Sequence, residues 1–170
     1  MVHINEEKNI LRYRLHDDSN YAWVYFTLDL DRYELIISGE VTASYKWVET
    51  KKSESFIELM LRCNEGYLTG KLGYSIPKEF NLEKSIEETI ENFKGYYEEL
   101  EEDFYEEIRG IDVSTSEGFY RAIEDIVDIY LVDTTDCYEC VECIEEHPYW
   151  LKKSVEYFCE HIKPLLKQIQ

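Results

Sequence analysis

The sequence lacks any long apolar run, and this absence narrows the classes of protein to which the chain can belong. Its 170 residues contain nothing close to the roughly 20 consecutive apolar residues that a membrane-spanning helix needs. The first residues show no basic stretch followed by an apolar core, so we expect no secretory signal. These absences predict a protein of the cytoplasm.

The sequence motifs of common enzymes are absent as well. The chain contains no GxxxxGK[ST] or GxGxxG phosphate-binding loop, no GxSxG nucleophile and no HExxH zinc motif. Cys143 and His147 can be written as a nucleophile pair, but metal binding or packing accounts better for such crowded cysteines. We therefore expect no enzyme and no catalytic residue, with a metal-dependent hydrolase or nuclease as the enzymatic alternative.

No segment rich in proline, glycine or serine divides the chain. Its length is that of one domain with one sizeable core. Hydrophobic residues make up 44% of it and aromatic residues 15%, which is enough apolar surface to oppose global disorder. The sequence therefore predicts a single folded domain over residues 1–170.

Positive charge is scarce, and the scarcity is concentrated in one part of the chain. The net charge is −19, to which residues 81–146 contribute 22 acidic and only four basic residues. Such a field repels the phosphates of nucleic acids and membranes and attracts basic surfaces. We therefore expect a basic protein partner, no direct contact with nucleic acid and no membrane.

Four runs of alternating or aromatic-rich residues predict strands within about residues 8–48. They cover residues 10–15, 21–28, 33–38 and 41–47, and short polar segments separate them. Such short connections favour an antiparallel arrangement of three or four strands.

From about residue 53 to residue 170, apolar residues recur every three or four positions, which predicts helices. Asn81 is placed to cap one long helix, or two joined near Gly95, and Pro148 to begin the last helix. Strands followed by helices indicate the α+β class. We expect an N-terminal antiparallel sheet packed with C-terminal helices.

Three cysteines and one histidine lie within eleven residues: Cys137, Cys140, Cys143 and His147. On a helix, Cys140, Cys143 and His147 would share one face. Zinc favours four sulfur or nitrogen ligands in a tetrahedral set, and the close spacing keeps the cost of loop closure low. The sequence therefore predicts a structural zinc site here.

This zinc prediction has alternatives. A helix hairpin turning at Pro148 would bring Cys159 close to Cys137 and Cys140, and His161 is a further candidate ligand. Without a metal, the cysteines would be small core residues, because free cysteine is often buried.

Carboxylates gather in the expected helix that follows Asn81, where only Lys84, Lys94 and Arg109 supply positive charge. Like charges at i, i+4 cost a few tenths of a kcal/mol each, so a face of one sign suits a basic partner. A row of carboxylates can also imitate DNA, which carries one charge per roughly 1.7 Å of its axis. The alternative is an ordinary solvated helix face. The residues expected to bind a partner are Glu98, Glu99, Glu101, Glu102, Asp103, Glu106 and Glu107.

Several short motifs occur along the chain, at residues 21–24, 44–47, 56–59, 67–72, 155–159 and 162–164. In sequence and in order they resemble the motifs of a family of small acidic proteins encoded by phages and prophages of Gram-positive bacteria. The Cys137–His147 cluster departs from the family's pattern. Some proteins similar to this family are anti-CRISPR proteins that inhibit the Cas9 effector of type II-A systems.

The resemblance implies a phage-encoded inhibitor that acts by stoichiometric binding in the cytoplasm of the bacterial host. The expected partner is Cas9, or another basic protein that handles nucleic acid, with guide or target DNA loading blocked by the acidic surface. The alternative is a phage-encoded modulator of another host protein that carries the structural zinc site. We expect a monomer or a homodimer.

Overall fold

The computed structural model describes residues 9–18, 22–48, 54–97, 100–130 and 137–169. Contacts within the chain group it into two compact units, Met1–Pro77 with His147–Gln170, and Lys78–Glu146. We call the first the sheet unit and the second the helical unit, and we describe each by itself. The single domain expected from the sequence stays a prediction, and unfolding experiments test it.

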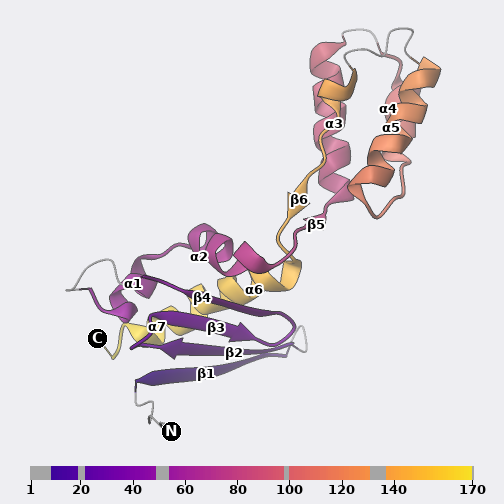
Figure 1. Cartoon of the computed structure of the whole chain (residues 1–170). Helices are drawn as coiled ribbons and strands as arrows, with labels where there is room; N and C mark the ends of the chain where they lie inside the picture. The colour runs from indigo at the N-terminus through magenta and orange to yellow at the C-terminus, as the bar shows by residue number, and fades with distance from the viewer. Residues whose placement is uncertain (1–8, 19–21, 49–53, 98–99, 131–136, 170) are drawn as a thin grey trace, which may run out of the picture. The chain divides into compact units, whose positions relative to one another are not determined.

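The sheet unit is built on a four-stranded antiparallel sheet with strand order β1-β2-β3-β4 (Figure 1). Side chains alternate between its faces, so that β2 buries Val24, Phe26 and Leu28 while Trp23 and Tyr25 stay exposed. The expected N-terminal antiparallel sheet is therefore confirmed, and so is the α+β class. The strands are β1 (Ile10–Asp17), β2 (Ala22–Asp29), β3 (Glu34–Ser38) and β4 (Thr42–Lys46).

The turns between the strands follow from local side-chain chemistry. After β2, the Asp29 carboxylate accepts hydrogen bonds from the backbone N–H groups of Asp31 (3.1 Å) and Arg32 (2.9 Å). Tyr33 then adopts a positive φ of 55°. Gly39, after β3, has no room for a side chain, because a Cβ there would collide with the carbonyl oxygen of Trp23.

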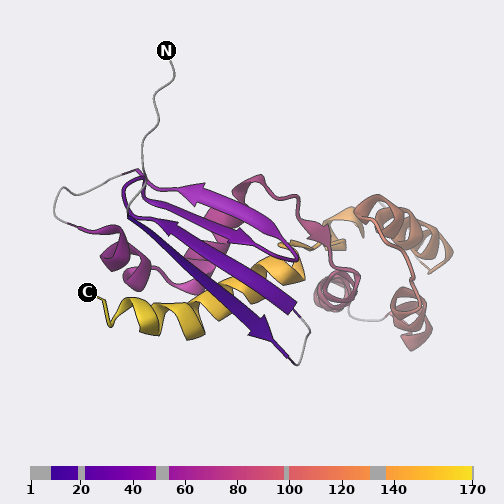
Figure 2. The same cartoon turned by 90° about the horizontal axis from the view of Figure 1, so that it is seen from below.

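Helices cover the buried face of this sheet (Figures 1 and 2). Ser55 and Glu58 form a capping box at the first helix, and the Asn64 side chain accepts a hydrogen bond from the Tyr67 N–H at the second. The last helical segment passes through a π-helical stretch just before Pro164, which has no N–H to continue the α-helical ladder. The elements are α1 (Phe56–Arg62), α2 (Glu65–Leu72), η1 (Gly73–Ser75), α6 (Tyr149–Tyr157), η3 (Phe158–Ile162) and α7 (Lys163–Leu166).

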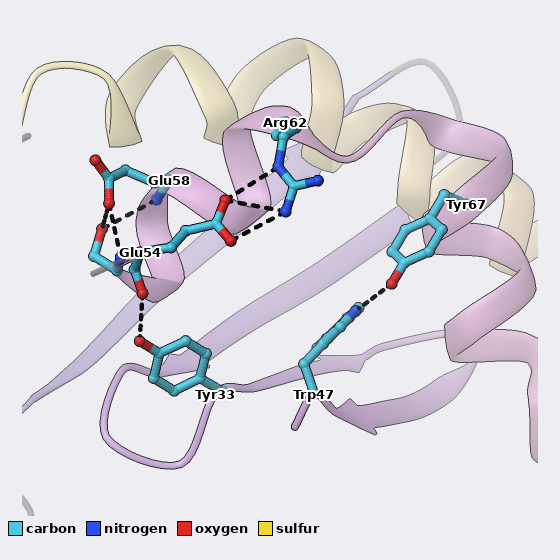
Figure 3. A network of polar contacts seen from close by, with 7 residues as sticks. Tyr33, Trp47, Glu54, Glu58, Arg62 and Tyr67 are labelled. Carbon is cyan, nitrogen blue, oxygen red and sulfur yellow. Dashed lines mark hydrogen bonds and ion pairs between the residues drawn. The ribbon is translucent and has the colours of Figure 1, made fainter. Parts of the chain in front are cut away.

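Polar contacts fasten α1 and α2 to one end of the sheet (Figure 3). The Tyr33 hydroxyl donates to the backbone carbonyl of Glu54 (2.6 Å), and the Glu54 carboxylate accepts two hydrogen bonds from Arg62 (3.1 Å each). The Trp47 indole N–H donates to the Tyr67 hydroxyl at 3.1 Å. These polar groups therefore have hydrogen-bond partners, while the rings of Tyr33 and Trp47 pack in or against the apolar core.

The helical unit packs α3, α4 and α5 against one another, and a short two-stranded ladder joins the ends of its chain segment. In this ladder, Glu79 pairs with Glu146 and Phe80 with Glu145. These strands are not apparent in the sequence, because two residues each are too few to show a period. The elements are β5 (Glu79–Phe80), α3 (Leu82–Tyr96), α4 (Glu102–Arg109), α5 (Ser116–Tyr130), η2 (Cys137–Cys140) and β6 (Glu145–Glu146).

Two of the expected helix signals can be checked in this unit. The Asn81 side chain accepts a hydrogen bond from the Lys84 N–H (3.1 Å), which confirms the expected cap. Of the two expected forms, one long helix or two joined near Gly95, the second is confirmed: α3 ends at Tyr96 and α4 begins at Glu102. Apolar side chains from α3, α4 and α5 form the core, in which the rings of Phe93 and Phe104 meet edge-on at 5.0 Å. In the described part of the chain, no helix is long and apolar enough to cross a bilayer.

Candidate functional site

The charge of the chain is divided unequally between its two units. The sheet unit carries 14 acidic and 13 basic residues, whereas the helical unit carries 23 acidic and only five basic ones. The helical unit therefore holds −18 of the net −19. A surface with one sign of charge at this density is the most distinctive feature of the molecule.

Five of the seven carboxylates expected to bind a partner lie on or just before α4. All five are exposed, because α4 turns Phe104, Tyr105 and Ile108 inward. Glu98 and Glu99 lie outside the described residues. The exposed ones are Glu101, Glu102, Asp103, Glu106 and Glu107.

Two of these carboxylates are partly neutralised within the protein. The Arg109 guanidinium contacts Glu102 at 2.9 Å and Glu106 at 2.6 Å. Its hydrogen bond lowers the pKa of Glu102 below the ordinary value. Whether α4 supplies the partner surface stays a prediction, and its carboxylates are less available than the sequence suggests.

A groove of about 880 Å³ runs along α3. Leu82, Ile86 and Ile90 lie at i, i+4 and i+8 and give it an apolar floor, to which Ile111, beyond the end of α4, adds. Leu82, Ile86 and Ile111 are each only partly buried, so the helical core leaves apolar surface accessible at this place. The volume lies in the range of ligand-binding sites.

Carboxylates form one wall of this groove. Glu83, Glu87 and Glu91 follow the apolar stripe at the neighbouring helical positions, and all three are exposed. None of them forms an ion pair or a hydrogen bond with another residue of the described ranges. The groove therefore combines an apolar floor with an acidic wall whose three carboxylates take part in no ion pair within the described residues.

The two cations that line the groove are engaged elsewhere. Arg109 pairs with Glu102 and Glu106, and the Lys94 ammonium lies 5.0 Å from the centre of the Tyr105 ring. This groove is not apparent in the sequence, because the 3.6-residue period assigns every apolar residue of α3 to the core. The repeat of a Glu directly after each floor residue of α3 is the signal that could have pointed to it.

The cysteine segment lies against α3. The buried Ser85 hydroxyl donates to the Asn81 carbonyl (2.7 Å) and accepts from the Ile144 N–H (2.9 Å). The Thr89 hydroxyl accepts from the Glu142 N–H at 3.0 Å. These contacts hold residues 141–144 in a non-helical path after η2.

The prediction that Cys140, Cys143 and His147 share one face of a helix is therefore wrong. Cys140 is buried in the helical core, and the half-buried Cys143 thiol donates to the Ser116 carbonyl at 3.8 Å. Burial, together with the nearby charge of Glu142 and Glu145, raises the pKa of Cys143. The side chain of Cys137, the fourth expected ligand, lies outside the described part of the structure.

No three His, Cys, Asp or Glu side chains converge as a metal site within the residues that the structure describes. The further candidate ligands lie in the sheet unit, where burial raises the pKa of Cys159, and His161 is exposed. The structural zinc site stays a prediction. Metal analysis of the purified chain tests it, since that prediction requires about one zinc per four-ligand site.

His147 is fixed by close packing within the sheet unit. Its ring lies 2.5 Å from the position that a Cβ of Gly73 would occupy, so only glycine fits at residue 73. Its Nδ1 atom is buried and finds no hydrogen-bond partner among the described residues. The contacts of Cys143 and His147 with Ser116 and Gly73 do not support the nucleophile pair that can be written from the sequence.

The exposed face of the sheet carries a different chemistry. The Arg14 guanidinium lies 3.7 Å from the centre of the Trp23 ring and 5.6 Å from that of Tyr25, and the His16 ring is 3.8 Å from Trp23. Arg14 and Tyr25 face each other across β1 and β2, as do His16 and Trp23. Such cross-strand pairs stabilise the sheet surface and cover the faces of its aromatic rings.

The fold and its groove define a small acidic α+β protein with a charged, grooved helical unit. Comparison with family models gives a match to a phage family, Phage_phiTE_072, over residues 3–164. The chain belongs to this family and is a phage protein. Comparisons with curated proteins and with solved structures give no significant match.

Proposed function

We propose that this phage protein acts by binding a host protein stoichiometrically through its acidic helical unit, and that this host protein is Cas9. The observation that carries the proposal is the excess of 23 acidic over five basic residues in that unit. A basic protein surface is the complement of such a field, and complementary charge speeds encounter and selects partners.

The arrangement of the carboxylates supports binding over a purely structural role. Glu83, Glu87 and Glu91 repeat at i, i+4 along α3, where like charges oppose helix formation by a few tenths of a kcal/mol per pair. Lys84, on the same helix, pairs instead with Glu146 at 2.5 Å. A surface that costs stability in the free protein is understandable when a cationic partner completes it.

Cas9 is the specific partner for two reasons. The chain belongs to a phage family. Its motifs also resemble those of small acidic phage proteins, and some proteins similar to these inhibit type II-A Cas9. Effectors of this kind hold the guide–target duplex in a positively charged channel. Carboxylates on the helical unit would compete for that channel and so block the loading of guide or target DNA.

We also propose that the protein is a binder and not an enzyme. A nucleophilic cysteine needs a lowered pKa, whereas burial raises the pKa of Cys63, Cys143 and Cys159. Metal-dependent turnover of a nucleic acid or a peptide by the purified chain would revive the enzymatic alternative.

The test is a DNA-cleavage assay in which purified chain is titrated against type II-A Cas9 with its guide. We expect inhibition that is complete at about one chain per Cas9 and that weakens steeply as salt rises from about 50 to 200 mM, because exposed charges are screened over about 10 Å. Inhibition that does not change with salt would exclude the acidic surface as its cause. A lack of inhibition with every type II-A Cas9 tried would exclude Cas9 and leave the alternative, a modulator of another basic host protein.

A further inference from the structure

We infer that the groove along α3 binds one amphipathic, basic α-helix of the partner protein. This inference rests on the proposed function and deepens it, because it names both the place of binding and the form of the segment that binds. It follows from the geometry of the floor, the charge of the wall and the length of α3.

The floor has the spacing that a second helix can match. Leu82, Ile86 and Ile90 are four residues apart, which on an α-helix corresponds to about 6 Å between successive side chains. A helix lying along α3 presents its own apolar side chains at i, i+4 and i+7 with nearly the same interval. Its anchors would enter between this stripe and Ile111.

The wall determines the charge of that helix. Glu83, Glu87 and Glu91 also recur about every 6 Å, so lysine or arginine at every third or fourth position of the partner would face all three. An acidic or a phosphate-bearing ligand is disfavoured, because the lining cations Lys94 and Arg109 already contact Tyr105 and two glutamates. Charge complementarity therefore points to a basic segment.

The length of α3 limits the length of the partner helix. Its 15 residues span about 22 Å, so a partner of about 15 residues covers the whole groove. An extended peptide would need a free strand edge for its backbone hydrogen bonds, whereas the groove is lined by α3 and the end of α4, whose helical backbone groups bond internally. A helix satisfies its own backbone and uses only side chains for contact.

The experiment uses the full chain and a fluorescent peptide of about 16 residues. The peptide carries leucine at i, i+4, i+7 and i+11 and lysine at the flanking positions. A control peptide has the same composition in scrambled order, so the charge is equal and the apolar stripe is lost. We expect saturable binding by anisotropy, a rise in helical circular dichroism, and at least a tenfold weaker affinity for the scrambled peptide.

Two triple variants of the chain separate the groove from the general field. Glu83→Lys with Glu87→Lys and Glu91→Lys reverses the charge of the wall. We expect this variant to bind the amphipathic peptide at least tenfold more weakly. Glu88→Lys with Asp125→Lys and Asp128→Lys changes the net charge equally at exposed sites that do not line the groove. This control should weaken binding no more than about threefold, because its three side chains do not line the groove and so do not face the bound helix.

Three outcomes would overturn the inference: equal binding of the two peptides, equal loss in the two triple variants, or no binding of the amphipathic peptide. All three variant positions of the wall are exposed, so the reversed chain is expected to fold, and its circular dichroism checks this. Equal binding of both peptides together with salt-sensitive inhibition of Cas9 would reject the groove and keep the proposed function. Selective binding of the amphipathic peptide without inhibition of any Cas9 would keep the groove as a binding site and reject Cas9 as the partner.

Discussion

The two units of this chain have similar cores beneath very different surfaces. Phe26 meets Phe158 at 5.6 Å in the sheet unit, and Phe93 meets Phe104 at 5.0 Å in the helical unit. Acidic and basic residues nearly balance in the first unit, whereas the second carries 23 acidic and five basic residues. The difference in charge has no counterpart in the packing, so the acidity of the helical unit is not what makes it fold.

The pairing of surface charges sharpens this contrast. In the sheet unit, the Glu54 carboxylate accepts hydrogen bonds from Nε and Nη2 of Arg62, and the Lys153 ammonium lies 2.7 Å from the Glu156 carboxylate. In the helical unit, Arg109 is shared between two glutamates, while Lys84 and Arg121 each pair with one. Exposed pairs contribute about 0–1 kcal/mol each, so neither pattern decides the fold. The helical unit could therefore accumulate carboxylates for another purpose, which we propose is partner binding.

The largest effect is expected from truncating the aromatic core of each unit. Phe104→Ala and Phe26→Ala each remove a fully buried ring, and we expect each to lower the free energy of unfolding by about 3–5 kcal/mol. Urea unfolding is followed by tryptophan fluorescence, which reports the sheet unit alone because Trp23, Trp47 and Trp150 all belong to it.

This pair of variants also tests the single domain predicted from the sequence. If the units unfold together, Phe104→Ala shifts the fluorescence midpoint as far as Phe26→Ala does. A fluorescence midpoint that stays in place while helical circular dichroism is lost would show that the units unfold separately. The comparison between the units would then extend to their stability.

A smaller effect is expected from filling the space of a glycine in the sheet unit. Gly73→Ala places a methyl group 2.5 Å from the His147 ring, and we expect a loss of about 1–3 kcal/mol in stability. Gly70→Ala is the matched control, because a Cβ there meets no atom within 4 Å and the residue lies in α2. The control should gain about 0.4–1 kcal/mol. Equal thermal midpoints for the two variants would contradict the packing of His147.

The smallest effect concerns the pH dependence of the helical unit. Hydrogen bonding to Arg109 lowers the pKa of Glu102 in the folded protein. Its contribution to stability is therefore present above the unfolded pKa of glutamate and is lost as pH falls through the lowered folded value. We expect the melting temperature of Glu102→Gln to lie below that of the unmodified chain at pH 7 and to equal it near pH 2. A difference between their melting temperatures that persists at the lower pH would exclude this ion pair as its source.

The sequence predicts the local elements well because their signals are local. The four strands lie close to where alternating residues place them, and Asn81 caps its helix through a contact three residues away. The acidity of residues 81–146 is likewise visible from composition, and it led to α4 as the candidate surface. The groove along α3 was not predicted, since it depends on Ile111, from beyond the end of α4, lining the same hollow as the apolar stripe of α3.

What the sequence alone determined is therefore the class of fold, the order of its elements and the place of its charge. Only the tertiary structure decided that β5 pairs with β6, that Ser85 and Thr89 draw the cysteine segment out of a helix, and that α3 carries an apolar groove with an acidic wall. The physical reason is distance along the chain. Periodicity and capping act over a few residues, whereas these contacts join positions up to 67 apart, such as Glu79 and Glu146, and arise only when a core brings them together.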